Sequence, residues 1–180
     1  MKMTTIFDAV RDGSLDDVKK MYKGDINEVN NELDLNLLCM AMTNMNNESE
    51  KIKIIQFLID EGININYTTS KYQRNALHML YFCNLRPSID YMVEISKVLI
   101  DNGIDINGLD KYKAIPLKYS ITINKLSTDE NKPLYWMLLE AGSNFELKDS
   151  FGKSCLDYAQ EYSWRNDFVK IVEEFESENK

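Results

Sequence analysis

Residues 99–107 read LIDNGIDIN, and this phrase decides the fold because it recurs at a nearly fixed interval. Its counterparts are LIDEGININ at 58–66 and LLEAGSNFE at 138–146, which place the central glycines 41 and 39 residues apart. Each phrase begins with the apolar end of a helix, and a glycine that follows a helix is typical of the left-handed residue that ends it. The alternating apolar and polar residues after the glycine predict a short extended arm. One structural unit is therefore repeated along the chain.

A second phrase recurs in step with the first. It reads NLLCMA at 36–41, NALHML at 75–80, IPLKYS at 115–120 and SCLDYA at 154–159, and its central leucines lie 39, 40 and 39 residues apart. Small and apolar residues at helical spacing predict a short first helix here, and a strongly apolar second helix follows after a polar stretch. Two phrases locked to one period indicate a row of stacked helical hairpins.

These phrases resemble the ankyrin repeat family, whose unit runs through a turn, an inner helix, an outer helix and a closing glycine phrase. The best matches are NALH at 75–78, GIDIN at 103–107 and DSFGKS at 149–154. The resemblance covers nearly the whole chain and implies an all-α fold, an ankyrin-type repeat solenoid of stacked helix-turn-helix units with short β-hairpin-like turns. We expect a single domain over 1–180. Its expected units are 4–31 as the N-terminal cap, 32–70, 71–110, 111–149, and 150–180 as the C-terminal cap.

The middle units depart from the family pattern in two ways. Each carries several extra residues between its helices, within 44–49, 84–88 and 125–131, and the polar composition of these stretches favours surface loops over longer helices. Gln73 and Lys113 replace the turn glycine in two units, which leaves the local turn geometry open there.

The last helix is predicted to close the row. A terminal unit has a neighbour on one side alone, so its outer face must be polar. The apolar residues Phe168, Ile171, Val172 and Phe175 recur at helical spacing, and glutamates occupy the other face.

Composition excludes several classes of function. There are 21 basic and 29 acidic residues, and a net charge of -8 disfavours binding to nucleic acid or to an anionic membrane. The apolar runs are far shorter than the roughly 20 residues of a membrane span, so we expect a cytoplasmic protein. Cys39, Cys83 and Cys155 are odd in number and widely spaced, which predicts buried reduced thiols rather than disulfides or a zinc site. We expect no metal and no cofactor.

Catalytic signatures are also missing from the sequence. It has a single histidine, no Gly-x-Ser-x-Gly elbow and no glycine-rich phosphate loop, so we expect no enzymatic activity. His78 occupies the histidine position of the resembled repeat, which implies a structural hydrogen-bonding bridge between adjacent turns.

The resemblance places recognition on the turn tips and on exposed first-helix positions. Tyr72, Tyr112 and Phe151 hold the same position in three successive turns, and basic residues surround them. Aromatic and arginine side chains are the types that most often dominate interface energies. The alternative is that the aromatic rings pack turn against turn while the lysines are merely solvated. The candidate partner-binding residues are Lys71, Tyr72, Arg74, Lys111, Tyr112, Phe151, Lys153, Phe82 and Tyr162.

The predicted function is non-enzymatic binding of another protein, as an adaptor or an inhibitor, by a monomer. The aromatic and basic stripe predicts an apolar and acidic patch on that partner. Acidic residues in the caps and outer helices are most simply a solubility feature. Two alternatives stay open, an immunity-type protein that neutralises a toxin and a structural scaffold that assembles with copies of itself.

Overall fold

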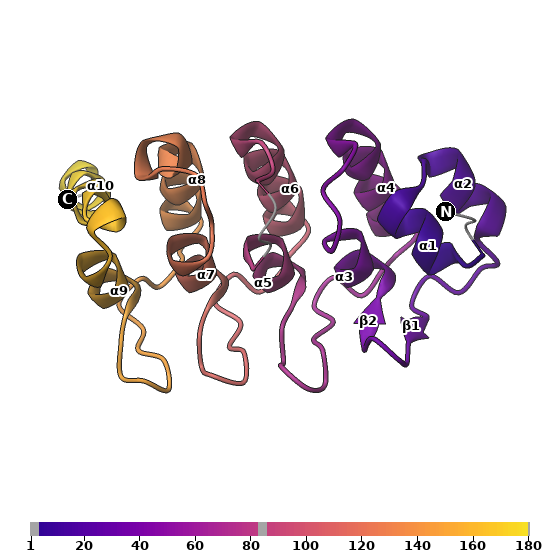
Figure 1. The fold of residues 1–180 in the computed structure, drawn as a ribbon, viewed down its shortest axis with the longest axis horizontal. Coiled ribbons are helices and arrows are strands. Elements are labelled where there is room, and N and C mark those ends of the chain that lie inside the picture. The colour runs from indigo at the N-terminus through magenta and orange to yellow at the C-terminus, as the bar shows by residue number, and fades with distance from the viewer. Residues whose placement is uncertain (1–3, 83–85, 180) are drawn as a thin grey trace.

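The structure is a computed structural model that describes residues 4–82 and 86–179, and the helices in it come in pairs. The pairs lie side by side in one row, with the two ends of the chain at opposite ends of the row and the turns projecting to one side (Figure 1). The described residues form the helices α1 (Ile6–Asp12), α2 (Leu15–Met21), α3 (Leu37–Ala41), α4 (Glu48–Asp60), α5 (Ala76–Tyr81), α6 (Ile89–Asp101), α7 (Pro116–Thr122), α8 (Thr128–Glu140), α9 (Cys155–Glu161) and α10 (Asp167–Glu178), and the 3-10 turn η1 (Ser163–Arg165).

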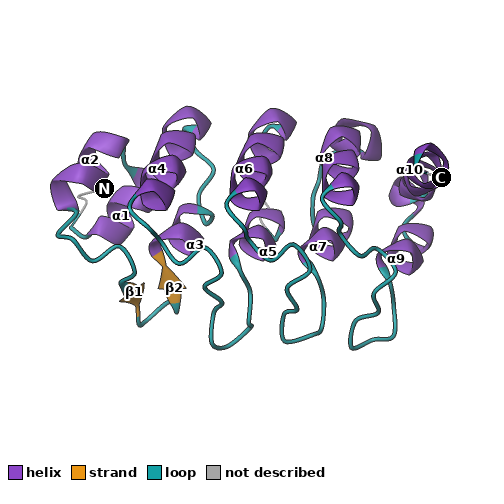
Figure 2. Cartoon of the chain, turned by 180° about the vertical axis from the view of Figure 1, so that it is seen from behind, coloured by secondary structure: helices purple, strands orange, loops and turns teal. Residues whose placement is uncertain are grey.

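The helices form two layers along the row (Figure 2). The first helices α1, α3, α5, α7 and α9 pack in sequence, and so do the second helices α2, α4, α6, α8 and α10. The one strand pair in the described ranges joins β1 (Val29–Asn30) and β2 (Leu35–Asn36) antiparallel, with Val29 opposite Asn36. The predicted all-α class with packed helix pairs is therefore confirmed.

Local capping explains where these short helices begin. Five of them start with a capping box, in which the N-cap side chain accepts from a backbone N–H and the third helical residue bonds back to the N-cap. The N-caps are Thr5, Ser14, Asn75, Ser127 and Ser154. These bonds satisfy N–H groups that a helix leaves unpaired at its start, which matters most in helices of two turns.

The prediction that the inserted residues form surface loops is confirmed for residues 44–47, 86–88 and 125–127, and it is wrong for residues 48–49 and 128–131, which begin second helices. The second helices α4, α6 and α8 have 13 residues each, against 7 in α2. Residues 44–47 and 125–127 are loops, but the helices begin directly after them. The polar residues that looked like helix breakers include N-caps, for example Ser127, which accepts from the N–H of Glu130. Of the insertion at 84–88, residues 84 and 85 lie outside the described residues.

The turn geometry survives the loss of glycine. Gln73 and Lys113 adopt φ of 56° and 57°, and Asp34 and Gly152 adopt 57° and 73° at the equivalent positions. All four turns therefore use a left-handed residue. A side chain other than glycine is strained in that region, and hydrogen bonds within the same turn hold the backbone there: the N–H of Gln73 donates to the carbonyl of Thr69 at 2.7 Å, and that of Lys113 to the carbonyl of Asp110 at 2.8 Å.

The core runs the length of the row. Leu38, Leu77 and Leu117 of the first-helix phrase are buried, whereas Leu156 at the end of the row is half-buried. Cys39 and Cys155 are buried and free, as expected for reduced thiols, and Cys83 lies outside the described residues.

The two-faced pattern predicted for the last helix is present in α10. Phe168, Ile171 and Val172 are buried, and Phe175 meets the ring of Trp136 edge-on at 5.8 Å. The glutamates of α10 are exposed. The helix therefore covers the last apolar face with one side and meets solvent with the other.

Two buried cations hold helix ends together across units. Arg165 is fully buried, and its guanidinium donates to the carbonyls of Ile121, Asn124 and Leu126 at 2.6–2.8 Å, just beyond and at the end of α7. The Lys51 ammonium is also buried and donates to the last carbonyls of α1. Carbonyls at a helix C-terminus lack partners within the helix and attract positive charge, which explains both contacts.

Candidate functional site

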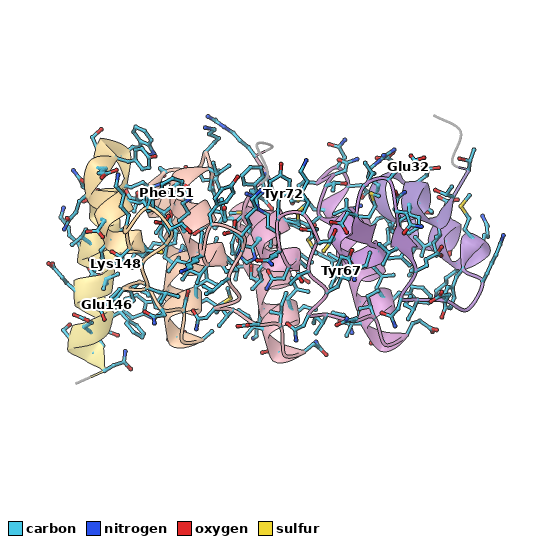
Figure 3. The ribbon with its side chains drawn as sticks, turned by 90° about the horizontal axis from the view of Figure 1, so that it is seen from below. Glu32, Tyr67, Tyr72, Glu146, Lys148 and Phe151 are labelled. Atoms are coloured by element: carbon cyan, nitrogen blue, oxygen red, sulfur yellow. The ribbon has the colours of Figure 1, made fainter. Side chains whose placement is uncertain are left out.

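Backbone hydrogen bonds align the turn tips. The N–H of Lys111 donates to the carbonyl of Tyr72 at 2.9 Å, and the N–H of Ser150 donates to the carbonyl of Tyr112 at 2.7 Å. Each turn therefore presents the same positions to its neighbour. Figure 3 shows the result from the turn side, where the labelled Glu32, Tyr72 and Phe151 lie along one edge of the row.

A buried aspartate shapes each of the last two turns. Oδ1 of Asp110 accepts from the N–H groups of Tyr112 and Ala114 at 2.8 and 3.0 Å. Oδ1 of Asp149 accepts from the N–H of Phe151 at 2.8 Å and of Lys153 at 3.3 Å. The local bonds of these aspartates fix the directions in which the aromatic side chains leave the backbone.

Between these turns and the first helices lies an open groove of about 570 Å³, here called the aromatic groove. The rings of Tyr112 and Phe151 stack at 6.3 Å with an interplanar angle of 23°, and Phe151 remains 66% exposed. Phe82 is 38% exposed. The groove is lined by Tyr72, Arg74, Phe82, Tyr112, Lys118, Tyr119, Ile123 and Phe151.

Arg74 is part of the wall of the aromatic groove and not a free contact residue. Its side chain is buried, with the guanidinium carbon 4.0 Å from the ring centre of Phe82 and 4.9 Å from that of Tyr119. Nη2 donates to the Tyr119 hydroxyl at 3.1 Å, and Nε lies 3.5 Å from the carboxylate of Asp110. Arg74, predicted as a partner-binding residue, therefore lines the groove with its charge enclosed by the rings of Phe82 and Tyr119 and by a buried carboxylate.

Tyr119 completes this buried cluster. Its hydroxyl donates to Oδ2 of Asp110, and burial, followed by the neighbouring carboxylate, raises the pKa of the phenol. Behind the groove, Arg74, Asp110 and Tyr119 thus form one connected polar network in which the carboxylate balances the charge of the guanidinium.

Lysines lie over the aromatic rings. The ammonium groups of Lys71 and Lys111 are 5.2 and 5.4 Å from the ring centre of Tyr72, on the border of the groove. The Lys118 ammonium is 4.6 Å from the ring centre of Tyr119, and burial lowers the pKa of Lys118. Lys153 differs from them, because its ammonium donates to the Glu161 carboxylate at 2.9 Å.

The structure brings together most of the predicted residues, with some exceptions. Tyr72, Arg74, Phe82, Tyr112 and Phe151 line the groove. Lys71 and Lys111 border it, whereas Lys153 is engaged with Glu161. Tyr162 is not among the lining residues and stacks on Trp164 with ring centres 4.8 Å apart.

Sequence reasoning did not predict three residues that line the groove, Lys118, Tyr119 and Ile123. Lys118 and Tyr119 belong to the recurring first-helix phrase, which predicted a short helix but supplied none of the candidate binding residues. Their types differ from those at the matching positions of α3, Cys39 and Met40, and this difference was the available signal.

His78 forms the bridge implied by the resemblance. Its Nε2 lies 2.9 Å from the carbonyl of Ala114, which can only accept, so Nε2 carries the proton. Nδ1 accepts from the N–H of Asn75 at 3.3 Å. Burial lowers the pKa of His78 to about 4, which keeps the ring neutral in the folded protein. The histidine ties α5 to the following turn.

Within residues 4–82 and 86–179, no group of three or more His, Cys, Asp and Glu side chains is arranged to hold a metal ion. None of the helices in the described part of the chain combines the length and apolar character needed to cross a membrane.

Paired helices packed in two layers, with an exposed aromatic groove on the turn side, place the chain among all-helical proteins. No family model matches it. Over 123 residues, 68% of the chain, it is 26% identical to an E3 ubiquitin-protein ligase, KEG, of Arabidopsis thaliana. The matched stretch is 7% of that ligase, so the chain is similar to a small portion of a much longer protein.

Proposed function

We propose that this chain is an ankyrin-type repeat protein that binds another protein through the aromatic groove. The observation that carries the proposal is the stacked pair Tyr112 and Phe151, which leaves a large aromatic surface open to solvent beside the half-buried Tyr72. Exposed apolar surface gathered in one concave place is typical of a binding site, and aromatic side chains often dominate interface energies.

Repetition along the row supports the ankyrin-type assignment. Successive units have a left-handed residue at the same position of the turn and a glycine at the end of the second helix, and the last three turns are joined by the same backbone hydrogen bond. In such arrays each unit contacts its neighbours and the stack provides a continuous surface. A groove built in this way needs no moving part, which suits an adaptor or an inhibitor.

We propose that the protein acts without catalysis and without a cofactor, as a cytoplasmic monomer. Both ring nitrogens of His78 are engaged with the backbone, and burial raises the pKa of the Cys39 thiol to about 12. A histidine whose pKa lies far below 7 and whose two nitrogens are already bonded is a poor proton carrier, and a thiol that stays protonated is a poor nucleophile.

Site-specific photo-crosslinking in cells of the native host tests the proposal. A benzophenone amino acid at position 151, in the groove, is compared with one at Lys97, an exposed position of α6. We expect a defined adduct with another protein from position 151, and its loss when Tyr112→Ser is added. Identical adducts from both positions would contradict the proposal.

A further inference from the structure

We propose that the aromatic groove takes an acidic segment of its partner, in which an aromatic or large aliphatic side chain is flanked by Asp or Glu. This inference rests on the proposed function, because it names the chemistry of the partner at the same groove. It follows from the charges around the groove, from its rings and from the way its composition changes along the row.

The charge around the groove is locally positive in a chain with a net charge of -8. Its lining residues include the cations Arg74 and Lys118 and no carboxylate. Lys71 and Lys111 add two ammonium groups at the border. Arg74 is paired with Asp110, whereas no ion pair within 4.0 Å joins the other three to a carboxylate in the described part of the chain. Complementary charge on a partner steers encounter and selects for acidic segments.

The aromatic rings of the groove indicate which kind of partner side chain would be buried there. Phe151 and Tyr112 form one stacked wall, and Phe82 and Tyr119 meet edge-on at 5.4 Å and form the other part of the lining. A volume of about 570 Å³ falls in the range of sites that bury a whole ligand group, so it has room for a large side chain with adjoining backbone. An apolar side chain between these rings would bring flanking carboxylates next to the lysines.

The composition of the row limits where the segment binds. The first turn carries Glu32 where later turns carry Lys71 and Lys111, and it carries Leu33 where later turns carry Tyr or Phe. An acidic segment is therefore repelled from the first turn and held along the turns at 71–74, 111–114 and 150–153. This asymmetry gives the bound segment one register.

Single-stranded nucleic acid is the other polymer that combines negative charge with groups that stack on rings. The acidic peptide is favoured because the protein as a whole is strongly acidic, so a phosphate backbone that continues beyond the groove meets repulsion. A short peptide segment ends within the positive patch.

Selection from a random peptide display library on the full chain tests the inference. We expect enriched peptides with a Phe, Trp, Tyr or Leu flanked by Asp or Glu. Fluorescence anisotropy of one labelled, enriched peptide then measures affinity for each variant. Phe151→Ser is expected to weaken binding by about tenfold or more, and its matched control Leu33→Ser, at the same position of the first turn, by less than about twofold.

Charge reversal separates the acidic requirement from simple apolar binding. Lys71→Glu with Lys111→Glu is expected to weaken binding by about tenfold, whereas Lys97→Glu with Lys23→Glu changes the net charge equally and is expected to have little effect. All four lysines are exposed, and circular dichroism checks that each variant folds.

The outcomes distinguish the two proposals. Enriched peptides that need Phe151 but carry no acidic residues would overturn the acidic segment and leave the groove as a binding site. Peptides that bind equally to the Phe151→Ser variant, or no enriched peptides, would count against both. A labelled oligothymidylate that binds as tightly as the peptide would overturn the acidic peptide in favour of nucleic acid.

Discussion

The side-chain amide of Asn66 donates to the carbonyl of Gly103 at 2.9 Å, while its Oδ1 accepts from the N–H of Asp105 at 2.7 Å. Asn107 makes the same pair of bonds to the next closing phrase, at Gly142 and Asn144. The asparagine of each extended arm thus ties the end of one second helix to the end of the next. Because the same bonds recur from unit to unit, they fix the spacing of the row.

Removing one of these bonded asparagines is expected to destabilise the row. Asn66→Ala leaves the Gly103 carbonyl and the Asp105 N–H to water, and we expect a loss of about 1 kcal/mol in the free energy of unfolding. Urea denaturation followed by circular dichroism measures it. Asn31→Ala in the exposed first turn is the control. Equal stability of the two variants would show that the ladder contributes nothing.

The stability of the protein is expected to fall with acid because of His78. Its pKa is about 4 in the folded state, below the ordinary value of 6.5, so the unfolded chain binds the proton first as the pH falls. The stabilisation is complete above about pH 6.5 and is lost towards pH 4, by about 3 kcal/mol.

Carboxylates titrate in part of the same window, so the comparison is made with His78→Gln. We expect this variant to be less stable near neutral pH and to lose less stability on acidification than the wild type. Urea denaturation at a series of pH values measures both slopes. Parallel slopes would contradict a neutral buried His78.

The left-handed turn residues offer a stabilising change. Lys113 has φ of 57° without being glycine, so Lys113→Gly removes strain of about 1 kcal/mol, offset in part by the greater freedom of the unfolded chain. We expect a gain of about 0.5 kcal/mol in thermal or urea unfolding. Gly152→Ala, at the equivalent position with φ of 73°, is expected to lose about 1 kcal/mol. The same sign for both changes would contradict the turn geometry.

Arg165 is expected to be the most sensitive polar residue of the C-terminal units. It is fully buried and donates to three carbonyls, of which that of Leu126 also accepts from the side-chain amide of Asn131. Arg165→Met removes the guanidinium from all three and is expected to cost about 3 kcal/mol or more. Arg86→Met, at an exposed arginine, is expected to change stability by less than about 0.5 kcal/mol. Differential scanning calorimetry of both variants measures the contrast. A small loss for Arg165→Met would mean that water replaces the guanidinium.

The sequence alone determined the helix pairs, their period and the closing glycines. These features depend on residues close together in the chain, because apolar spacing sets a helical face and a glycine permits the left-handed end. The same local logic predicted the polar cap in α10. The same logic was wrong for the part of the insertions that is helical. A serine such as Ser127 is found both in loops and at helix N-caps, and here it caps α8.

Only the tertiary structure decided which side chains of the stripe stay open. Arg74 and Phe151 belong to the same sequence pattern, yet Arg74 is enclosed by Tyr119, 45 residues away, and Phe151 is exposed. Lys118 lines the groove although the sequence did not predict it. Tyr162, which was predicted to lie there, instead stacks on Trp164. A repeat pattern places a residue on a turn or a helix, but its exposure depends on side chains that stacking brings from neighbouring units.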